Sequence, residues 1–309
     1  MRSGFTHEAL FYEDSAQFLE ETVSFIREGL AAKEPVMVAL AGPRIGMLRA
    51  ELGADAEPVE FVDMESLGRN PGRILPAWRE FVERAAADGL STRGIGEPAW
   101  PGRSPEELTE CEHHESLLNL AFADAAGFTL LCPYDAAALE AEVLDAARRH
   151  HPVVVESDGL HPSDRYVEPG VGEALLGARL APAPGDADTL SFGEGDLPAI
   201  RDFVRERAAA AGIERDRLAD VVLAVNELAT NSMRHGGGTG ILRTWLDQRA
   251  LHCEVEDAGR VVDPLLGRTR PTPSQDYGRG LWLVHQLCDL FQLRSGPAGT
   301  IARISMARA

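Results

Sequence analysis

The first half of the chain alternates between short apolar runs and longer stretches in which apolar residues recur every three or four positions, and this alternation limits most strongly how it can fold. The short runs are typical of buried strands and the longer stretches of helices. Strands separated by helices pair in parallel through helical crossovers. We therefore expect an α/β domain with a mainly parallel sheet covered by helices. The expected strands are EALFYE, PVMVALAG, VEFVDM, LSTRGIGE, FTLLCPYD and PVVVES.

The second half has a different pattern. Two helical stretches precede two strand-like runs, and a loop, a third helical stretch and two closing strand-like runs follow. This order predicts an α+β two-layer sandwich, with an antiparallel sheet and helices on one face. Proline and glycine are frequent between the two halves, which is typical of a connector. We expect a first domain at residues 1–158, a connector at 159–188 and a second domain at 189–309.

Composition and charge exclude several classes of protein. The formal net charge of −19 argues against direct nucleic-acid binding, because the chain cannot neutralise many phosphates. No run approaches the roughly 18 apolar residues of a membrane span, and the N-terminus has no apolar signal-peptide core. The cysteines form no C-x-x-C pair and lie in apolar segments. We expect a cytoplasmic protein with reduced, buried cysteines and with neither a nucleic acid nor a membrane as its partner.

The stretch AVNELATNSMRHGGG, residues 224–238, carries the most informative local pattern. Glu227, Asn231 and His235 are four residues apart, so on a helix they share one face. The rest of the helix is apolar, and a polar face on a buried helix costs free energy unless each group has a partner. The face is therefore either solvated or part of a ligand site at the helix end.

Three further segments favour the ligand site. Asp257 ends a strand-like run just before Gly259, so its carboxylate can accept a hydrogen bond from an exocyclic amine while the glycine admits a flat ring. Gly278 and Gly280 precede a helix, where backbone N–H groups suit phosphate. Thr300 enters the last strand and brings a hydroxyl to the same ring.

Two groups of the helix suit the rest of a nucleotide. Asn231 can offer its amide oxygen to Mg²⁺, and Glu227 can orient or deprotonate a hydroxyl near a γ-phosphate. Each segment alone is a weak signal, but their order and spacing together are specific.

On these motifs the second domain resembles the GHKL ATPase superfamily, the Bergerat fold of gyrase, MutL and histidine kinases. NELATNSMRHG matches its N box, EDAGR its first glycine box, YGRGLWLV its second and GTIARI its closing strand. The resemblance covers residues 189–307 and is greatest to the small anti-sigma-factor kinases of the RsbW and SpoIIAB type. One departure is that Arg260 and Val261 follow Gly259, where the first glycine box has a second glycine.

The resemblance implies an ATP·Mg²⁺ site and a protein kinase. It implies that Glu227 is the general base, that Asn231 is the magnesium ligand, and that Asp257 and Thr300 contact adenine. The other implied nucleotide-binding residues are His235, Gly259, Gly278, Arg279, Gly280 and Leu281. It also implies that the domain sequesters a sigma factor and phosphorylates an anti-sigma-factor antagonist on Ser or Thr. Whether the chain acts as a monomer or a homodimer stays open.

Two alternatives to a serine/threonine kinase remain. In a non-catalytic switch, ATP would only set the shape of a protein-binding surface, and the presence of Glu227 favours catalysis over this reading. A sensor histidine kinase would carry a phosphoacceptor histidine on a helical hairpin before the N box. No histidine occurs between His161 and His235, which disfavours this class.

The first domain resembles the MEDS sensory domain of DcmR-type regulators over residues 5–157, on segments such as HESLLNLAF and LLCPYD. The resemblance implies a degenerate RecA/KaiC-like fold with a sensory role. Because the connector is long, we expect the first domain to control the second in response to a small ligand or a protein contact. The loop in VMVALAGPRIGMLR lacks the Lys-Ser/Thr pair of a P-loop, so we expect no nucleotide there. Candidate ligand contacts, with core positions as the alternative, are His7, Glu97, Trp100, Glu115 and Asn119.

The run ECEHHES in this domain contains Cys111, His113 and His114. Neighbouring residues on a helix point in different directions, and no second pair of ligands lies nearby in the sequence. We therefore expect a solvated helix face here rather than a metal site.

Overall fold

The computed structural model describes residues 4–156, 159–168, 176–177, 180–271 and 278–308. It divides the chain into two compact units, Met1–Pro169 and Gly170–Ala309. Parts of the expected connector, at 169–175 and 178–179, lie outside the described residues, as does Tyr277 of the second glycine box. No helix in the described part of the chain is long and apolar enough to cross a membrane. All four cysteines are free and buried, as expected.

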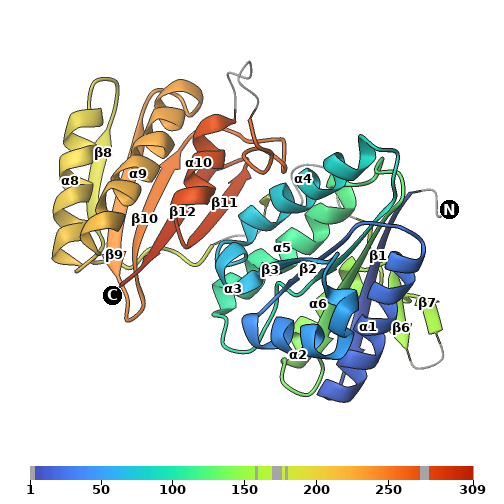
Figure 1. Cartoon of the computed structure of the whole chain (residues 1–309). Coiled ribbons are helices and arrows are strands. Elements are labelled where there is room, and N and C mark those ends of the chain that lie inside the picture. The colour runs from blue at the N-terminus through green and yellow to red at the C-terminus, as the bar shows by residue number, and fades with distance from the viewer. Residues whose placement is uncertain (1–3, 157–158, 169–175, 178–179, 272–277, 309) are drawn as a thin grey trace. The chain divides into compact units, whose positions relative to one another are not determined.

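The first unit contains a seven-stranded sheet in the order β3-β2-β4-β5-β1-β6-β7 (Figure 1). Neighbouring strands of this sheet are parallel except β6 with β7, so the predicted, mainly parallel sheet is confirmed. All five residues of β2 are buried, which is typical of a strand covered on both faces. The strands are β1 (Phe5–Tyr12), β2 (Val36–Leu40), β3 (Glu60–Asp63), β4 (Thr92–Gly96), β5 (Phe128–Asp135), β6 (Val153–Glu156) and β7 (Gly159–Pro162).

Only some helices of this unit begin at polar side-chain caps. Asp14 accepts hydrogen bonds from the first turn of α1, and Ser104 forms a capping box with Glu107 at α5. The helices are α1 (Ser15–Ala31), α2 (Gly42–Leu52), α3 (Met64–Leu67), α4 (Ile74–Ala86), α5 (Pro105–Ala121) and α6 (Ala141–His150), with 3-10 turns at Gly53–Ala56 and Pro71–Arg73.

The second unit contains a five-stranded antiparallel sheet in the order β11-β12-β10-β9-β8. Helices α8, α9 and α10 lie against this sheet (Figure 1), and their side chains share one buried cluster with the strands. The predicted α+β fold is confirmed. The elements are β8 (Asp188–Phe192), α8 (Leu197–Ala210), α9 (Arg215–His235), β9 (Gly240–Leu246), β10 (Ala250–Asp257), α10 (Arg279–Leu287), β11 (Leu290–Gly296) and β12 (Gly299–Ala307).

Two edge strands differ from the sequence-based expectation. β7 lies within the stretch expected to be a connector and pairs with β6, while β8 precedes the helix with which we expected the second domain to begin. Neither strand has the apolar alternation of a half-buried strand, because most of their residues are exposed. β7 and β8 are strands because they form hydrogen bonds to a neighbouring strand, and their local sequence pattern does not indicate this.

Candidate functional site

The polar face of α9 faces the start of α10. Glu227 and Asn231 are partly buried, while His235 at the end of the helix is exposed. A Cβ added at Gly280 would lie 2.8 Å from Oε2 of Glu227 and 3.7 Å from Oδ1 of Asn231, so these two side chains border the first turn of α10. The structure thus brings Glu227, Asn231 and Gly280 together, which is the first part of the expected site.

The N-terminus of α10 has the backbone that its glycines predict. Gly278 is the N-cap with a φ of 84°, a conformation that favours glycine. Arg279 follows as an exposed residue, whereas Leu281 is buried in the core of the unit. Unpaired N–H groups of the first helical turn are suited to phosphate, and glycine at 280 keeps the space between them and Glu227 open.

Asp257 is held in a fixed orientation at the end of β10. Oγ of Ser232 donates to one carboxylate oxygen at 2.5 Å, and the backbone N–H of Gly259 donates to the other at 2.7 Å. A Cβ at Gly236 would lie 2.4 Å from Cγ of Asp257, so the end of α9 approaches the carboxylate closely. Each carboxylate oxygen retains acceptor capacity for an amine.

Thr300 lies directly opposite Asp257 in the β10–β12 register. Its hydroxyl donates to the carbonyl oxygen of Gly259 at 2.9 Å and contacts the Ser295 hydroxyl at 2.8 Å. The Thr300 hydroxyl donates its only proton to Gly259, so in its contact with Ser295 the Ser295 hydroxyl is the donor. The Ser295 oxygen in turn accepts a hydrogen bond from the Val261 N–H at 2.8 Å. Thr300 therefore supports the turn after Asp257 and keeps acceptor capacity for a neighbouring group.

Sequence reasoning missed Ser232 and Ser295. Ser232 directly follows Asn231 in the N box, and a hydroxyl one position from a predicted ligand could have signalled it. Ser295 carries no such signal, because only the pairing of β11 with β12 places it beside Thr300.

The donor set of these residues fits adenine nucleotide with Mg²⁺. Asp257 offers a fixed carboxylate for an exocyclic amine, and the α10 N-terminus offers backbone N–H groups for phosphate. Asn231 offers an amide oxygen, the ligand type that Mg²⁺ accepts, next to the carboxylate of Glu227. The close approach of Gly236 and Gly280 to these acidic groups leaves no room for larger side chains.

In the first unit the structure brings three of the five candidate contacts together. Nδ1 of His7 lies 3.1 Å from Oδ1 of Asn119, and Nε2 of His7 lies 3.0 Å from Oε2 of Glu115. His7 and Glu115 are buried. Burial lowers the pKa of His7 to about 3, against the opposing effect of its hydrogen bond to Asn119, so the imidazole is neutral.

Glu97 and Trp100 make other contacts. Glu97 is buried, forms an ion pair with Arg44, and accepts a hydrogen bond from the hydroxyl of Tyr12 at 3.2 Å. Arg44 also pairs with Asp135 at 3.1 Å, so one guanidinium serves two carboxylates. The ring of Trp100 is partly buried, and the guanidinium carbon of Arg103 lies 3.5 Å from its centroid.

The pKa of Glu97 makes the stability of the first unit depend on pH. Burial raises this pKa from 4.5 to about 8; Arg44 opposes the shift and Asp135 adds to it. A raised native pKa stabilises the fold below pH 4.5, and this contribution is lost as the pH rises through 8. The full loss is on the order of 4 kcal/mol in the free energy of unfolding.

We expect Glu97→Gln to remove most of this pH dependence. Urea unfolding of the full chain at pH 5 and pH 8.5 measures it, with Glu60→Gln, an exposed carboxylate paired with Arg84, as the control. An equal pH dependence in wild type and Glu97→Gln would show that Glu97 keeps an ordinary pKa.

The run ECEHHES does not form a solvated face, and that prediction was wrong. Cys111 and His114 are buried in α5, and the Cys111 thiol donates to the carbonyl oxygen of Pro98 at 3.2 Å. Tertiary contacts cover this side of the helix despite its polar sequence.

A pocket of about 290 Å³ lies between α5 and α6, with Glu115 and Tyr134 in its wall.

The fold of the second unit is that of a GHKL-type ATPase domain. Residues 192–306 match the family model of the histidine kinase-like ATPase domain. Residues 6–152 match the family model of the MEDS domain, described as the methanogen/methylotroph, DcmR sensory domain. The chain thus joins an N-terminal MEDS domain to a C-terminal histidine kinase-like ATPase domain.

A solved structure is similar to part of this chain. It is the crystal structure of the RsbU and RsbW domains of Rv1364c from Mycobacterium tuberculosis, with 21% sequence identity and a TM-score of 0.30. The match covers 42% of this chain and 34% of that chain, so it spans about a third of that protein.

Proposed function

We propose that the second domain, residues 189–309, binds ATP·Mg²⁺ and phosphorylates a serine or threonine of an anti-sigma-factor antagonist, and that it also sequesters a sigma factor. We further propose that the first domain, residues 1–158, controls this activity in response to a small molecule or a protein contact. The observation that carries the kinase proposal is the placement of Glu227 and Asn231 against Gly280 at the start of α10.

Each residue has a distinct role in this proposal. ATP would supply the phosphoryl group, which leaves ADP when the acceptor oxygen forms its bond to phosphorus. Glu227 takes the proton of the attacking hydroxyl, and Asn231 holds Mg²⁺ through its amide oxygen. Asp257 accepts a hydrogen bond from the adenine amine, oriented by Ser232 and Gly259. The first turn of α10, from Gly278 to Leu281, faces the phosphates, with Arg279 exposed beside them.

Calorimetric titration of the full chain with ATP tests the nucleotide site. We expect Asp257→Ala to weaken binding by about 10- to 100-fold with or without Mg²⁺, because it removes a charged acceptor worth about 1.5–3 kcal/mol. Asn231→Ala should weaken binding only when Mg²⁺ is present. The matched control is Asp247→Ala, since Asp247 also accepts backbone N–H groups but lies at the other end of the β9–β10 hairpin.

The two variants separate adenine recognition from metal binding. Unchanged affinity in both would contradict the site. Tight ATP binding in wild type, with no phosphate transfer to any partner, would favour the non-catalytic switch.

A further inference from the structure

Four buried side chains of the first unit converge from four different elements. Among the described residues, His7 of β1, Glu115 of α5, Cys132 of β5 and His151 just after α6 bring their ligand atoms within 4.8 Å of one another. His7 and Cys132 lie on the same side of the sheet, because β1 and β5 pair in parallel with Ala9 opposite Cys132. The cluster is independent of the nucleotide site.

Four of the six separations between these atoms lie within about half an ångström of those that a tetrahedral ion requires. Nε2 of His7 lies 3.4 Å from Sγ of Cys132 and 3.0 Å from Oε2 of Glu115. The same oxygen lies 3.4 Å from Nε2 of His151 and 3.8 Å from Sγ of Cys132. A tetrahedral ion with metal–nitrogen and metal–oxygen bonds of about 2.0–2.2 Å and a metal–sulfur bond of about 2.3 Å separates its ligands by about 3.3–3.6 Å.

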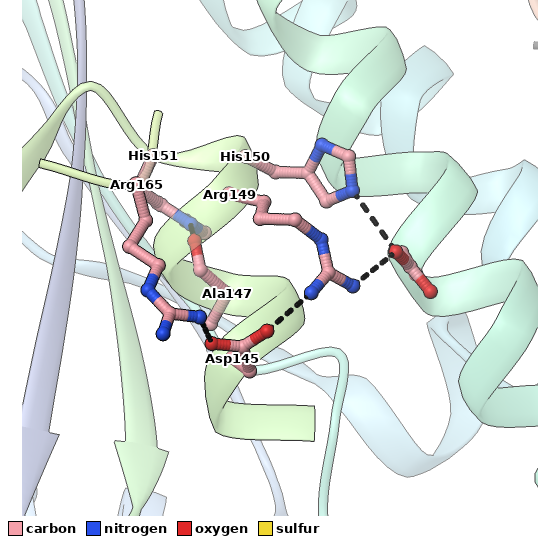
Figure 2. Close-up of polar contacts among 7 residues, drawn as sticks. Asp145, Ala147, Arg149, His150, His151 and Arg165 are labelled. Atoms are coloured by element: carbon pink, nitrogen blue, oxygen red, sulfur yellow. Dashed lines mark hydrogen bonds and ion pairs between the residues drawn. The ribbon is translucent and has the colours of Figure 1, made fainter. Parts of the chain in front are cut away.

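Both imidazoles present a lone pair to the centre of the cluster. Nδ1 of His7 lies 3.1 Å from Oδ1 of Asn119, and Nδ1 of His151 lies 2.7 Å from the carbonyl oxygen of Ala147 (Figure 2). An oxygen of this kind can only accept, so each Nδ1 carries the proton and each Nε2 carries the lone pair.

Two further contacts fix this arrangement. Nδ2 of Asn119 donates to the carbonyl oxygen of His150 at 2.7 Å, which fixes the amide with its oxygen toward His7. The last turn of α6, which positions His151, is held by ion pairs of Asp145 with Arg149 and Arg165 (Figure 2). Outer contacts of this kind are what hold metal-binding histidines in position.

The cluster has too few protons for the acceptors that it gathers. Two imidazole lone pairs and a carboxylate face one another, and the thiol of Cys132 is the one donor among the four groups. Nε2 of His151 and Oε1 of Glu115 make no hydrogen bond to any described residue. Two imidazole lone pairs and a carboxylate share one thiol proton, and the Tyr134 hydroxyl is a further donor to Glu115 only. Buried acceptors with so few donors are costly, and a cation at their centre stabilises them.

We propose that His7, Glu115, Cys132 and His151 bind one divalent transition-metal ion of the zinc class. Two nitrogens, one thiolate and one carboxylate suit zinc, whereas Mg²⁺ and Ca²⁺ require oxygen ligands. Binding releases the Cys132 proton to solvent, and the thiolate and carboxylate then neutralise the charge of the ion, so the buried unit is neutral overall. The pocket beside α5 and α6, which includes Glu115 in its wall, gives the ion a path from solvent.

Cobalt substitution in the full chain, prepared without a polyhistidine tag, tests this proposal. The chain is stripped with chelator and titrated with Co²⁺, and the bound metal is also counted by mass spectrometry after growth with Zn²⁺. We expect one equivalent of zinc per chain, intense visible bands of tetrahedral Co²⁺, and a thiolate-to-cobalt charge-transfer band. Zn²⁺ should displace the cobalt and raise the thermal unfolding midpoint.

Cys132→Ser is the informative variant, and Cys111→Ser is its matched control. Cys111 is also a buried thiol of this unit, but it bonds to Pro98 outside the cluster. We expect Cys132→Ser to lose the charge-transfer band and to bind Zn²⁺ at least about 10-fold more weakly, while Cys111→Ser keeps both. The proposal is overturned if wild type retains no stoichiometric zinc and develops no charge-transfer band, a result that needs no variant to fold. A folded Cys132→Ser that keeps the band overturns it as well.

Discussion

Glu227→Gln will lower the rate of phosphate transfer by about 10²- to 10⁴-fold and leave ATP affinity within a few fold of wild type. The loss follows from the role of a general base, which removes the proton of the attacking hydroxyl as the bond to phosphorus forms. Glutamine has nearly the shape of glutamate but cannot take that proton. Because Glu227 borders Gly280 rather than Asp257, its replacement leaves the adenine contact in place.

Two readouts measure this effect. One is transfer of radiolabelled phosphate from ATP to the antagonist protein that copurifies with the full chain, and the other is slow ATP hydrolysis by the chain alone. Asp216→Asn is the control, since Asp216 is an exposed carboxylate in the first turn of the same helix. Equal turnover in Glu227→Gln and wild type would show that Glu227 is not the general base. That result would not contradict the proposed ATP site.

Gly236→Ala will weaken ATP binding by about 10- to 150-fold without unfolding the domain. The new methyl group would lie 2.4 Å from Cγ of Asp257 and 2.6 Å from one of its oxygens, so the carboxylate must move away from Ser232 and Gly259. Loss of an oriented, charged acceptor costs about 1.5–3 kcal/mol, which corresponds to roughly 10- to 150-fold in affinity.

Gly296→Ala is the control for this substitution, because a Cβ at Gly296 meets nothing within 4 Å. Calorimetry gives the affinity, and circular dichroism shows that both variants fold. If Gly236→Ala binds ATP as tightly as Gly296→Ala, then Asp257 can be displaced without loss, and it does not recognise adenine.

The local sequence pattern was sufficient to predict most strands and helices, because they are continuous apolar runs or have a clear helical period. The buried run Val36–Leu40 is a local signal, and the structure has the strand that it predicts. The face of α9 that carries Glu227 and Asn231 was also predictable, since a spacing of four residues fixes a common side of a helix. The edge strands β7 and β8 were not, because their order depends on a neighbouring strand.

The sequence by itself determined the fold class of each half and the family that each half resembles. Only the tertiary structure decided which distant side chains meet. Ser295 reaches Thr300 through the β11–β12 register, and Cys132 meets His151 because β5, β1 and β6 are neighbours in the sheet. Spacing along the chain specifies a face within one element, whereas contact between elements depends on strand order and register, which no local pattern encodes.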